Sequence, residues 1–146
     1  MIRKLAIAIS FLVFSLNAQA QPVGNTLGLS QASLTFKAAS VVNTAQAVKN
    51  STAIMCGYYL HCARASTCFF KFYNATATAI NAAGLANSIP KLTYPLPAGA
   101  SANAMVECNR GIGFTTAISI ACTTGVADND NGAPSANECV ANIYYK

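Results

Sequence analysis

Short segments in which every second residue is apolar are the feature that most restricts the fold of this 146-residue chain. In residues 117–122, for example, Ile118, Ile120 and Cys122 alternate with alanine and serine. A period of two over five to eight residues is typical of β-strands, because successive side chains point to opposite faces of a sheet. The predicted strands are 33–36, 54–62, 68–72, 91–96, 112–114, 117–122 and 139–145.

Turn-forming residues separate the predicted strands, most clearly at 81–84, 97–99 and 128–132. Helix-forming segments are scarce. Residues 38–49 are rich in alanine, but their valines and threonine form helices poorly, so at most one short helical turn is expected there. Many short strands with regular breaks predict an all-β fold, an antiparallel β-sandwich or jelly roll, as a single domain over residues 31–146.

The amino-terminal residues 1–20 have the three parts of a secretory signal peptide. Arg3 and Lys4 form a basic start, residues 5–16 are almost entirely apolar, and a small-x-small site ends at Ala20. The apolar run is too short for a membrane-spanning helix, which needs about 20 residues. We therefore predict cleavage near Ala20, with an uncleaved anchor as the alternative.

Cleavage near Ala20 leaves a mature chain of low charge, with seven basic and four acidic residues and a net charge of +3. Residues 21–30 are predicted to form a flexible leader before the folded domain. The mature chain is expected to have no membrane span, and its scattered cations predict no nucleic-acid partner. The expected location is secreted, either extracellular or periplasmic.

The cysteine content agrees with export. All six cysteines follow the predicted cleavage site, and an even number in a small exported chain is typical of a disulfide framework. Zinc binding is disfavoured because the first three cysteines are each six residues apart, whereas zinc sites favour CxxC spacing. The predicted disulfide cysteines are Cys56, Cys62, Cys68, Cys108, Cys122 and Cys139.

Six cysteines allow 15 pairings, and the positions of the strands favour one of them as a hypothesis. Cys122 ends a predicted strand and Cys139 begins the last one. If these strands are antiparallel neighbours, a disulfide closes the base of the loop between them. A second disulfide across a five-residue connection and a third between the remaining cysteines complete the hypothesis: Cys122–Cys139, Cys62–Cys68 and Cys56–Cys108.

Residues for catalysis are few. His61 is the sole histidine, the chain has no GxSxG motif, and six paired cysteines leave no free thiol. A glycoside hydrolase needs two suitably spaced carboxylates, and the supply is small. The four acidic residues are Glu107, Asp128, Asp130 and Glu138. We therefore expect a protein that is not an enzyme and has no cofactor.

The segment from Asp128 to Gly132 has some likeness to a calcium-binding loop. An EF-hand loop has glycine at position six and glutamate at position twelve, whereas here glycine is at five and Cys139 is at twelve. A looser calcium site that uses Asp128 and Asp130 is a weak candidate. The alternative is a polar turn in which these side chains cap their own backbone, and no metal is expected.

Adjacent aromatic residues occur in several predicted strands, so one member of each pair points outward. An exposed aromatic surface forms if the strands that carry the outward members are neighbours, and such a surface suits subunit contacts or sugar stacking. The alternative is that neighbouring loops cover these rings. The predicted contact residues are Tyr59, Phe69, Tyr73 and Tyr144.

Several short motifs keep a fixed order between residues 57 and 146. They are Gly57-Tyr58-Tyr59-Leu60, Lys71-Phe72-Tyr73-Asn74, Leu96-Pro97-Ala98-Gly99, Thr123-Thr124-Gly125-Val126-Ala127-Asp128 and Asn142-Ile143-Tyr144-Tyr145-Lys146. This ordered set resembles small phage virion β-sandwich proteins of the tail-fibre or decoration type. The resemblance implies a structural, non-enzymatic module, here in an exported version that contains cysteines.

These observations together predict an exported, disulfide-stabilised structural β-sandwich subunit of an extracellular fibre, surface or virion-like assembly. Its expected partners are further copies of itself or other subunits of a surface or particle. The alternative is a secreted carbohydrate-binding or adhesin module, which would use the same outward aromatic residues for sugar.

Overall fold

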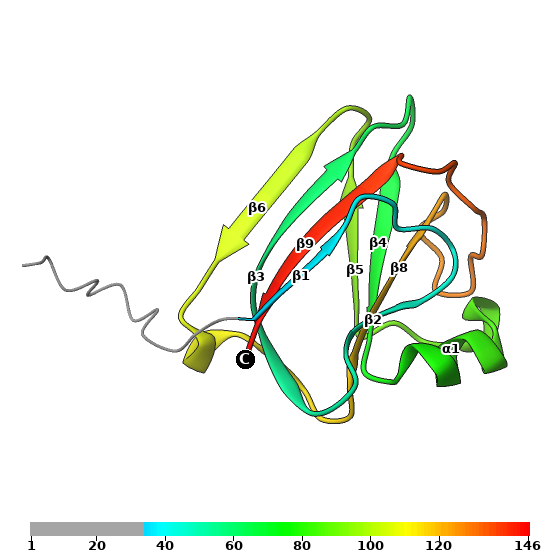
Figure 1. The fold of residues 1–146 in the computed structure, drawn as a ribbon. Coiled ribbons are helices and arrows are strands. Elements are labelled where there is room, and N and C mark those ends of the chain that lie inside the picture. Colours follow the sequence, from blue (N-terminus) through cyan, green and yellow to red (C-terminus); the bar gives the residue numbers. More distant parts are fainter. Residues whose placement is uncertain (1–33) are drawn as a thin grey trace, which may run out of the picture.

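Two antiparallel sheets lie face to face in the computed structural model, which describes residues 34–146 (Figure 1). Sheet A has the strand order β1(Leu34–Ala38), β9(Cys139–Tyr145), β3(Ala53–Cys62) and β6(Ser101–Met105), and β7(Ile112–Phe114) also pairs with β3. Sheet B has the order β2(Gln46–Lys49), β8(Ile118–Thr123), β4(Cys68–Tyr73) and β5(Leu92–Leu96). The three helical segments are α1(Ala77–Ala83), η1(Leu85–Asn87) and η2(Cys108–Arg110).

The two strand orders are those of a jelly roll, in which strands that follow one another in sequence mostly belong to opposite sheets. The prediction of an all-β, antiparallel sandwich is therefore confirmed. The signal peptide predicted at 1–20 and the leader predicted at 21–30 lie outside the described residues. No helix among residues 34–146 is long and apolar enough to span a membrane.

All seven predicted strands are present, and two further strands were not predicted. β6 has the sequence SANAM, whose alternation involves only small and polar residues until Met105, and β2 has only four residues. Both strands therefore lack the large apolar residues that make a period of two visible. Residues 38–49, where at most one short helical turn was expected, contain no helix, and residues 46–49 form β2.

The only α-helix of the described chain is α1, and part of it was wrongly predicted as a turn at 81–84. Thr76 caps this helix, since its side chain accepts a hydrogen bond from Ala79 N at 3.2 Å. Gly84 ends the helix with a φ of 78°, a conformation that favours glycine. Threonine followed eight residues later by glycine was the local signal for this helix.

The core lies between the sheets and consists of the inward residues of each strand. The predicted alternation of inward and outward residues, called parity below, holds along most strands. The completely buried large residues of this core include Leu60, Phe70, Phe72, Ile118, Ile120 and Ile143. At the start of β3 the parity changes, because the register with β9 shifts between Met55 and Gly57. As a result Met55 is buried and Ile54 is only half-buried.

A second, smaller cluster covers the outer face of sheet B. Tyr73 of β4 is completely buried there beside Ile80 of α1 and Leu85 of η1. Its hydroxyl has no hydrogen-bond partner among the described residues.

Two tyrosines have a raised pKa because they are partly or wholly buried. Burial, together with the nearby charge of Asp128, raises the pKa of Tyr73 to about 12. Burial, and secondarily the neighbouring Tyr94, raise the pKa of Tyr58, in β3 of sheet A, to about 12.

These two tyrosines predict a loss of stability at alkaline pH. An unfolded tyrosine ionises near pH 10, whereas Tyr58 and Tyr73 keep their protons in the folded chain to about pH 12. The part of the free energy of unfolding that depends on these neutral tyrosines is therefore complete below about pH 10, and it is lost as the pH rises towards 12. Urea unfolding at a series of pH values measures this loss. Tyr58→Phe with Tyr73→Phe should flatten the dependence, and an unchanged slope in that variant would contradict the assignment.

Candidate functional site

The outer face of sheet A carries a row of uncharged polar and aromatic side chains. Tyr59 of β3 lies opposite Asn142 of β9 on one side and opposite Asn103 of β6 on the other. Each of these residues alternates with the buried or partly buried residues of its own strand, so all three side chains point away from the core. A tyrosine ring is therefore flanked on both sides by amide groups.

The next row on this face contains a glycine between two large side chains. Gly57 of β3 lies opposite Tyr144 of β9 and Met105 of β6. A Cβ atom at Gly57 would lie 2.5 Å from the carbonyl oxygen of Ala104 and 2.7 Å from the Sδ atom of Met105. A side chain is thus excluded by the close approach of β6, and the sulfur atom of Met105 occupies the space beside Gly57.

Residues of these two rows line a groove with a volume of about 660 Å³. Its lining residues are Tyr58, Tyr59, Asn103, Met105, Asn142 and Tyr144. The lining offers ring faces for stacking, phenol hydroxyls, and amides that both donate and accept hydrogen bonds. It includes no ionisable acid or base other than the phenols. A groove of this chemistry fits an uncharged ligand with many hydroxyl groups.

Ser101 of β6 holds the outer side of the groove together. Its Oγ atom lies 2.9 Å from His61 Nδ1 and 3.3 Å from the Tyr59 hydroxyl. A serine beside a histidine is also part of a nucleophilic site, but such a site needs a third group that orients the imidazole. Among the described residues, His61 makes its one side-chain hydrogen bond to Ser101. The arrangement therefore positions Tyr59 and does not form an oriented triad.

The predicted aromatic contact surface is divided between the two sheets. Tyr59 and Tyr144 lie on the outer face of sheet A, as expected for neighbouring strands. The prediction was wrong for the other two residues, because β4 belongs to sheet B. Phe69 is half-buried on that sheet and Tyr73 is covered by α1.

Sequence reasoning missed the residues that complete the groove. Asn103 and Met105 belong to the unpredicted strand β6, and Gly57 gave no sign that a neighbouring strand lies so close. Asn142 lies within a predicted strand, but an isolated asparagine carries no signal of a site. Only the pairing of three strands brings these residues beside Tyr59.

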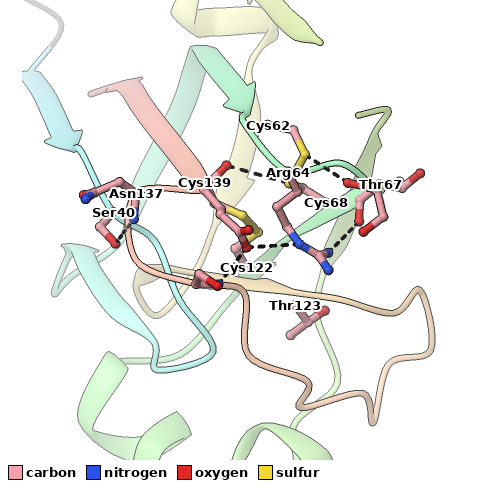
Figure 2. The surroundings of a disulfide bond; sticks show 12 residues. Ser40, Cys62, Arg64, Thr67, Cys68, Cys122, Thr123, Asn137 and Cys139 are labelled. Carbon is pink, nitrogen blue, oxygen red and sulfur yellow. Dashed lines mark hydrogen bonds and ion pairs between the residues drawn. A yellow bond between two sulfur atoms is a disulfide. The ribbon is translucent and has the colours of Figure 1, made fainter. Parts of the chain in front are cut away.

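Two disulfides close one end of the sandwich (Figure 2). Cys62 and Cys139 are opposite each other in sheet A, whereas Cys68 and Cys122 belong to neighbouring strands of sheet B. The Cys62–Cys68 and Cys122–Cys139 disulfides therefore both join sheet A to sheet B. The hypothesised pairing is confirmed, but the reason given for Cys122–Cys139 was wrong, because β8 and β9 are not neighbours in one sheet.

The third disulfide, Cys56–Cys108, joins the register shift of β3 to η2. Since η2 lies between β6 and β7, this disulfide anchors their connection to β3, with which both strands pair. At the other end of the sandwich, the sulfur atoms of Cys68, Cys122 and Cys139 lie within 4.8 Å of one another. All three are bonded in disulfides, so none is a thiolate ligand for a metal.

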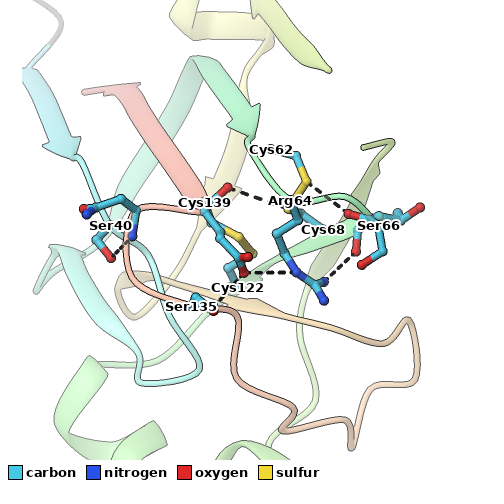
Figure 3. Close-up of polar contacts among 11 residues, drawn as sticks. Ser40, Cys62, Arg64, Ser66, Cys68, Cys122, Ser135 and Cys139 are labelled. Atoms are coloured by element: carbon cyan, nitrogen blue, oxygen red, sulfur yellow. Dashed lines mark hydrogen bonds and ion pairs between the residues drawn. A yellow bond between two sulfur atoms is a disulfide. The ribbon is translucent and has the colours of Figure 1, made fainter. Parts of the chain in front are cut away.

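Polar contacts surround the pair of disulfides at the closed end (Figure 3). The Nε atom of Arg64 lies 3.1 Å from Oε2 of Glu138, and the Nη1 atom of Arg64 donates to the carbonyl of Thr67 at 3.0 Å. The same Oε2 atom accepts from Ser135 N at 2.7 Å. Glu138, one of the four carboxylates available for catalysis, therefore joins the segment before Cys139 to the connection between β3 and β4.

A buried lysine organises the loop between β8 and β9. Lys71 of β4 points to the outer face of sheet B and is completely buried. Its Nζ atom donates to the carbonyl oxygens of Ala127 at 2.6 Å, Asp128 at 3.3 Å and Asp130 at 3.0 Å. Burial lowers the pKa of Lys71, and the charges of Asp130 and Asp128 oppose this shift.

The weak calcium candidate lies in this same loop. The carbonyl oxygens that a looser calcium site would need are bound by the ammonium group of Lys71. The Oδ1 atom of Asp130 accepts hydrogen bonds from Gly125 N at 3.0 Å and from Gly132 N at 3.1 Å. The geometry is therefore that of the alternative, a polar turn in which an aspartate caps its own backbone.

No protein-family model matches the chain, and no curated protein or solved structure is significantly similar to it. The three disulfides indicate an oxidising compartment, either extracellular or periplasmic.

Proposed function

We propose that this chain is an exported, non-catalytic module that binds carbohydrate in the groove on the outer face of sheet A. The observation that carries the proposal is the row in which Tyr59 lies between Asn142 and Asn103 in the groove. Each of these residues belongs to a strand of the sheet. The site is therefore held by a rigid scaffold.

Carbohydrate fits this groove better than other ligand classes for chemical reasons. A sugar ring has an apolar face of C–H groups that stacks on a tyrosine, and its edge is lined with hydroxyl groups. Amide side chains can donate to and accept from such hydroxyls without the cost of burying a charge. A phosphate or a nucleic acid would need cations, and the groove lining has none.

Export is part of the proposal. Residues 1–20 would direct the chain across a membrane, and the three disulfides would form on the oxidising side. A module of this kind suits an adhesin, which must keep its shape outside the cell. Jelly rolls occur both in lectins and in viral capsids, so the fold is compatible with this role but does not decide it.

Removing the central ring should abolish most binding. Tyr59→Ala removes the stacking surface between the two amides, and we expect the dissociation constant for a recognised neutral polysaccharide to rise about tenfold or more. Affinity electrophoresis of the oxidised chain in gels that contain neutral polysaccharides, followed by calorimetry with oligosaccharides of the retained polymer, measures this change.

Phe69→Ala is the matched control, because it removes an aromatic ring from the outer side of the opposite sheet. It should leave polysaccharide binding unchanged. Two results would count against the proposed function. One is an equal loss of binding in both variants, and the other is that the unaltered chain binds no neutral polysaccharide.

A second candidate is the structural subunit of an extracellular fibre, surface or virion-like assembly. It is favoured by exposed apolar side chains at the end of sheet A that holds the start of β3. Leu34 and Ile112 lie at the two ends of one cross-strand row, with the half-buried Tyr145 and the buried Met55 between them. Leu34 is 52% exposed and Ile112 is 38% exposed. Apolar surface of this kind suits contacts with other subunits.

A further inference from the structure

The free edges of the two sheets differ in how they are protected from pairing with another chain. Exposed edge strands are usually guarded by proline, lysine or a bulge. In sheet B, β5 contains Pro95, and β2 contains Lys49 and an irregular register with β8. In sheet A, the edge strand β1 carries the exposed Lys37.

The fourth edge is formed by β6 and by the three-residue strand β7, which both pair with the same side of β3. The longer strand, β6, has none of these features. Its residues Ser101–Met105 include no charge and no proline, and its register with β3 is regular. Figure 1 shows β6 at the outer margin of sheet A. Within residues 34–146, its one pairing partner is β3. The outward side of β6 is therefore an unprotected edge.

The backbone groups on this edge can be assigned from the contacts at both ends of β6. Cys62 N donates to Ala100 O at 2.9 Å, and Val106 N donates to Cys56 O at 2.8 Å. Backbone groups alternate in direction along an antiparallel strand. The even-numbered residues of β6 therefore face β3, and the N–H and C=O groups of Ser101, Asn103 and Met105 face outward.

We propose that β6 pairs with β6 of a second copy of this chain, antiparallel and about a two-fold axis at Asn103. In this register Asn103 lies opposite its own counterpart, and Ser101 lies opposite Met105 of the second copy. The pairing adds about six backbone hydrogen bonds and brings no like charges together. It also covers Met105 and Val106, which are 50% and 45% exposed.

A two-fold contact is favoured over a continuing chain of copies. Pairing of β6 with β1 of another copy would also be antiparallel, but it would place Lys37 at every junction and would not close. Pairing of β6 with itself uses the one unguarded edge twice. It therefore yields a closed dimer with no free β6 edge.

The dimer has a consequence for the groove, and this consequence rests on the proposed function. A two-fold axis perpendicular to the sheet leaves both outer faces on the same side. The rings of Tyr59 and its counterpart would be separated by three strand spacings, about 14 Å. Two grooves would then form one continuous surface, which suits a linear oligosaccharide of several sugar units.

The test places a charge at the two-fold axis. Asn103→Asp brings two carboxylates together in the dimer, and we expect the dimer dissociation constant to rise about tenfold, less so at high salt. Asn142→Asp is the matched control, since it makes the same change in the groove but two strands away from the edge. Sedimentation equilibrium of the oxidised chain over a range of concentrations measures both variants.

Ser101→Pro is a second variant, which removes an outward N–H group that β3 does not use. We expect it to weaken the dimer as Asn103→Asp does, with the unfolding transition retained. A chain that remains a monomer at millimolar concentration, grows into open-ended filaments, or forms a dimer insensitive to both variants would overturn the proposal. Sugar binding by the unaltered chain is measured separately, so a chain that forms the dimer but binds no polysaccharide contradicts only the proposed function.

Discussion

Replacing Cys56 and Cys108 together with alanine is expected to lower the free energy of unfolding by about 4 kcal/mol. This disulfide spans 52 residues, and a disulfide that closes a long loop restricts the unfolded chain most. It also ties the register shift in β3 to η2. A loss of this size is a large share of the 5–15 kcal/mol that stabilises a typical domain. Urea unfolding at neutral pH measures it.

The Cys62–Cys68 disulfide provides the comparison, because it spans only 6 residues. Its removal by the same double substitution should cost about 2 kcal/mol through the unfolded chain. Both of its cysteines are completely buried, whereas Cys108 is half-buried. A larger loss for Cys62 and Cys68 would therefore show that packing at the closed end, and not restriction of the unfolded chain, dominates the stabilisation.

Lys71→Met is expected to destabilise the chain by about 3 kcal/mol. The substitution keeps much of the volume of the side chain but removes a buried ammonium group and leaves three carbonyl oxygens without their donor. Because these carbonyls belong to residues 127–130, the loop between β8 and β9 should open first. Urea unfolding measures the loss, and limited proteolysis should show new cleavage between residues 124 and 138.

Lys37→Met is the matched control for Lys71→Met. Lys37 is exposed on the edge strand β1, so its replacement should change the free energy of unfolding by no more than about 0.5 kcal/mol. Equal losses for the two variants, or a loop that resists proteolysis in Lys71→Met, would show that the ammonium group does not hold the loop.

The groove and the buried lysine show opposite uses of an outward strand position. Tyr59 and Lys71 both have the parity that points away from the core. Tyr59 lines an open groove on sheet A, whereas Lys71 is enclosed because the loop between β8 and β9 folds over sheet B. The parity of a strand residue therefore defines its side of the sheet, but the loops decide whether that side is a surface.

The sequence by itself determined the fold class, and it predicted that the chain is exported. A period of two is a local property, since it depends only on the alternation of side chains along one strand. It identified seven strands, and with the turns between them it predicted the sandwich. The disulfide pairing was also correct, although Cys122–Cys139 joins two sheets and does not close a hairpin within one.

Only the tertiary structure decided which strands are neighbours, and the candidate site depends on that. Tyr59 and Tyr144 share a face because β3 pairs with β9, and Tyr73 is buried because β4 lies in the sheet that α1 covers. Asn103 became visible only when β6 paired with β3. Strand pairing joins residues far apart in the chain through backbone hydrogen bonds, which any residue except proline can both donate and accept. Side-chain patterns along one strand therefore contain little information about its neighbours.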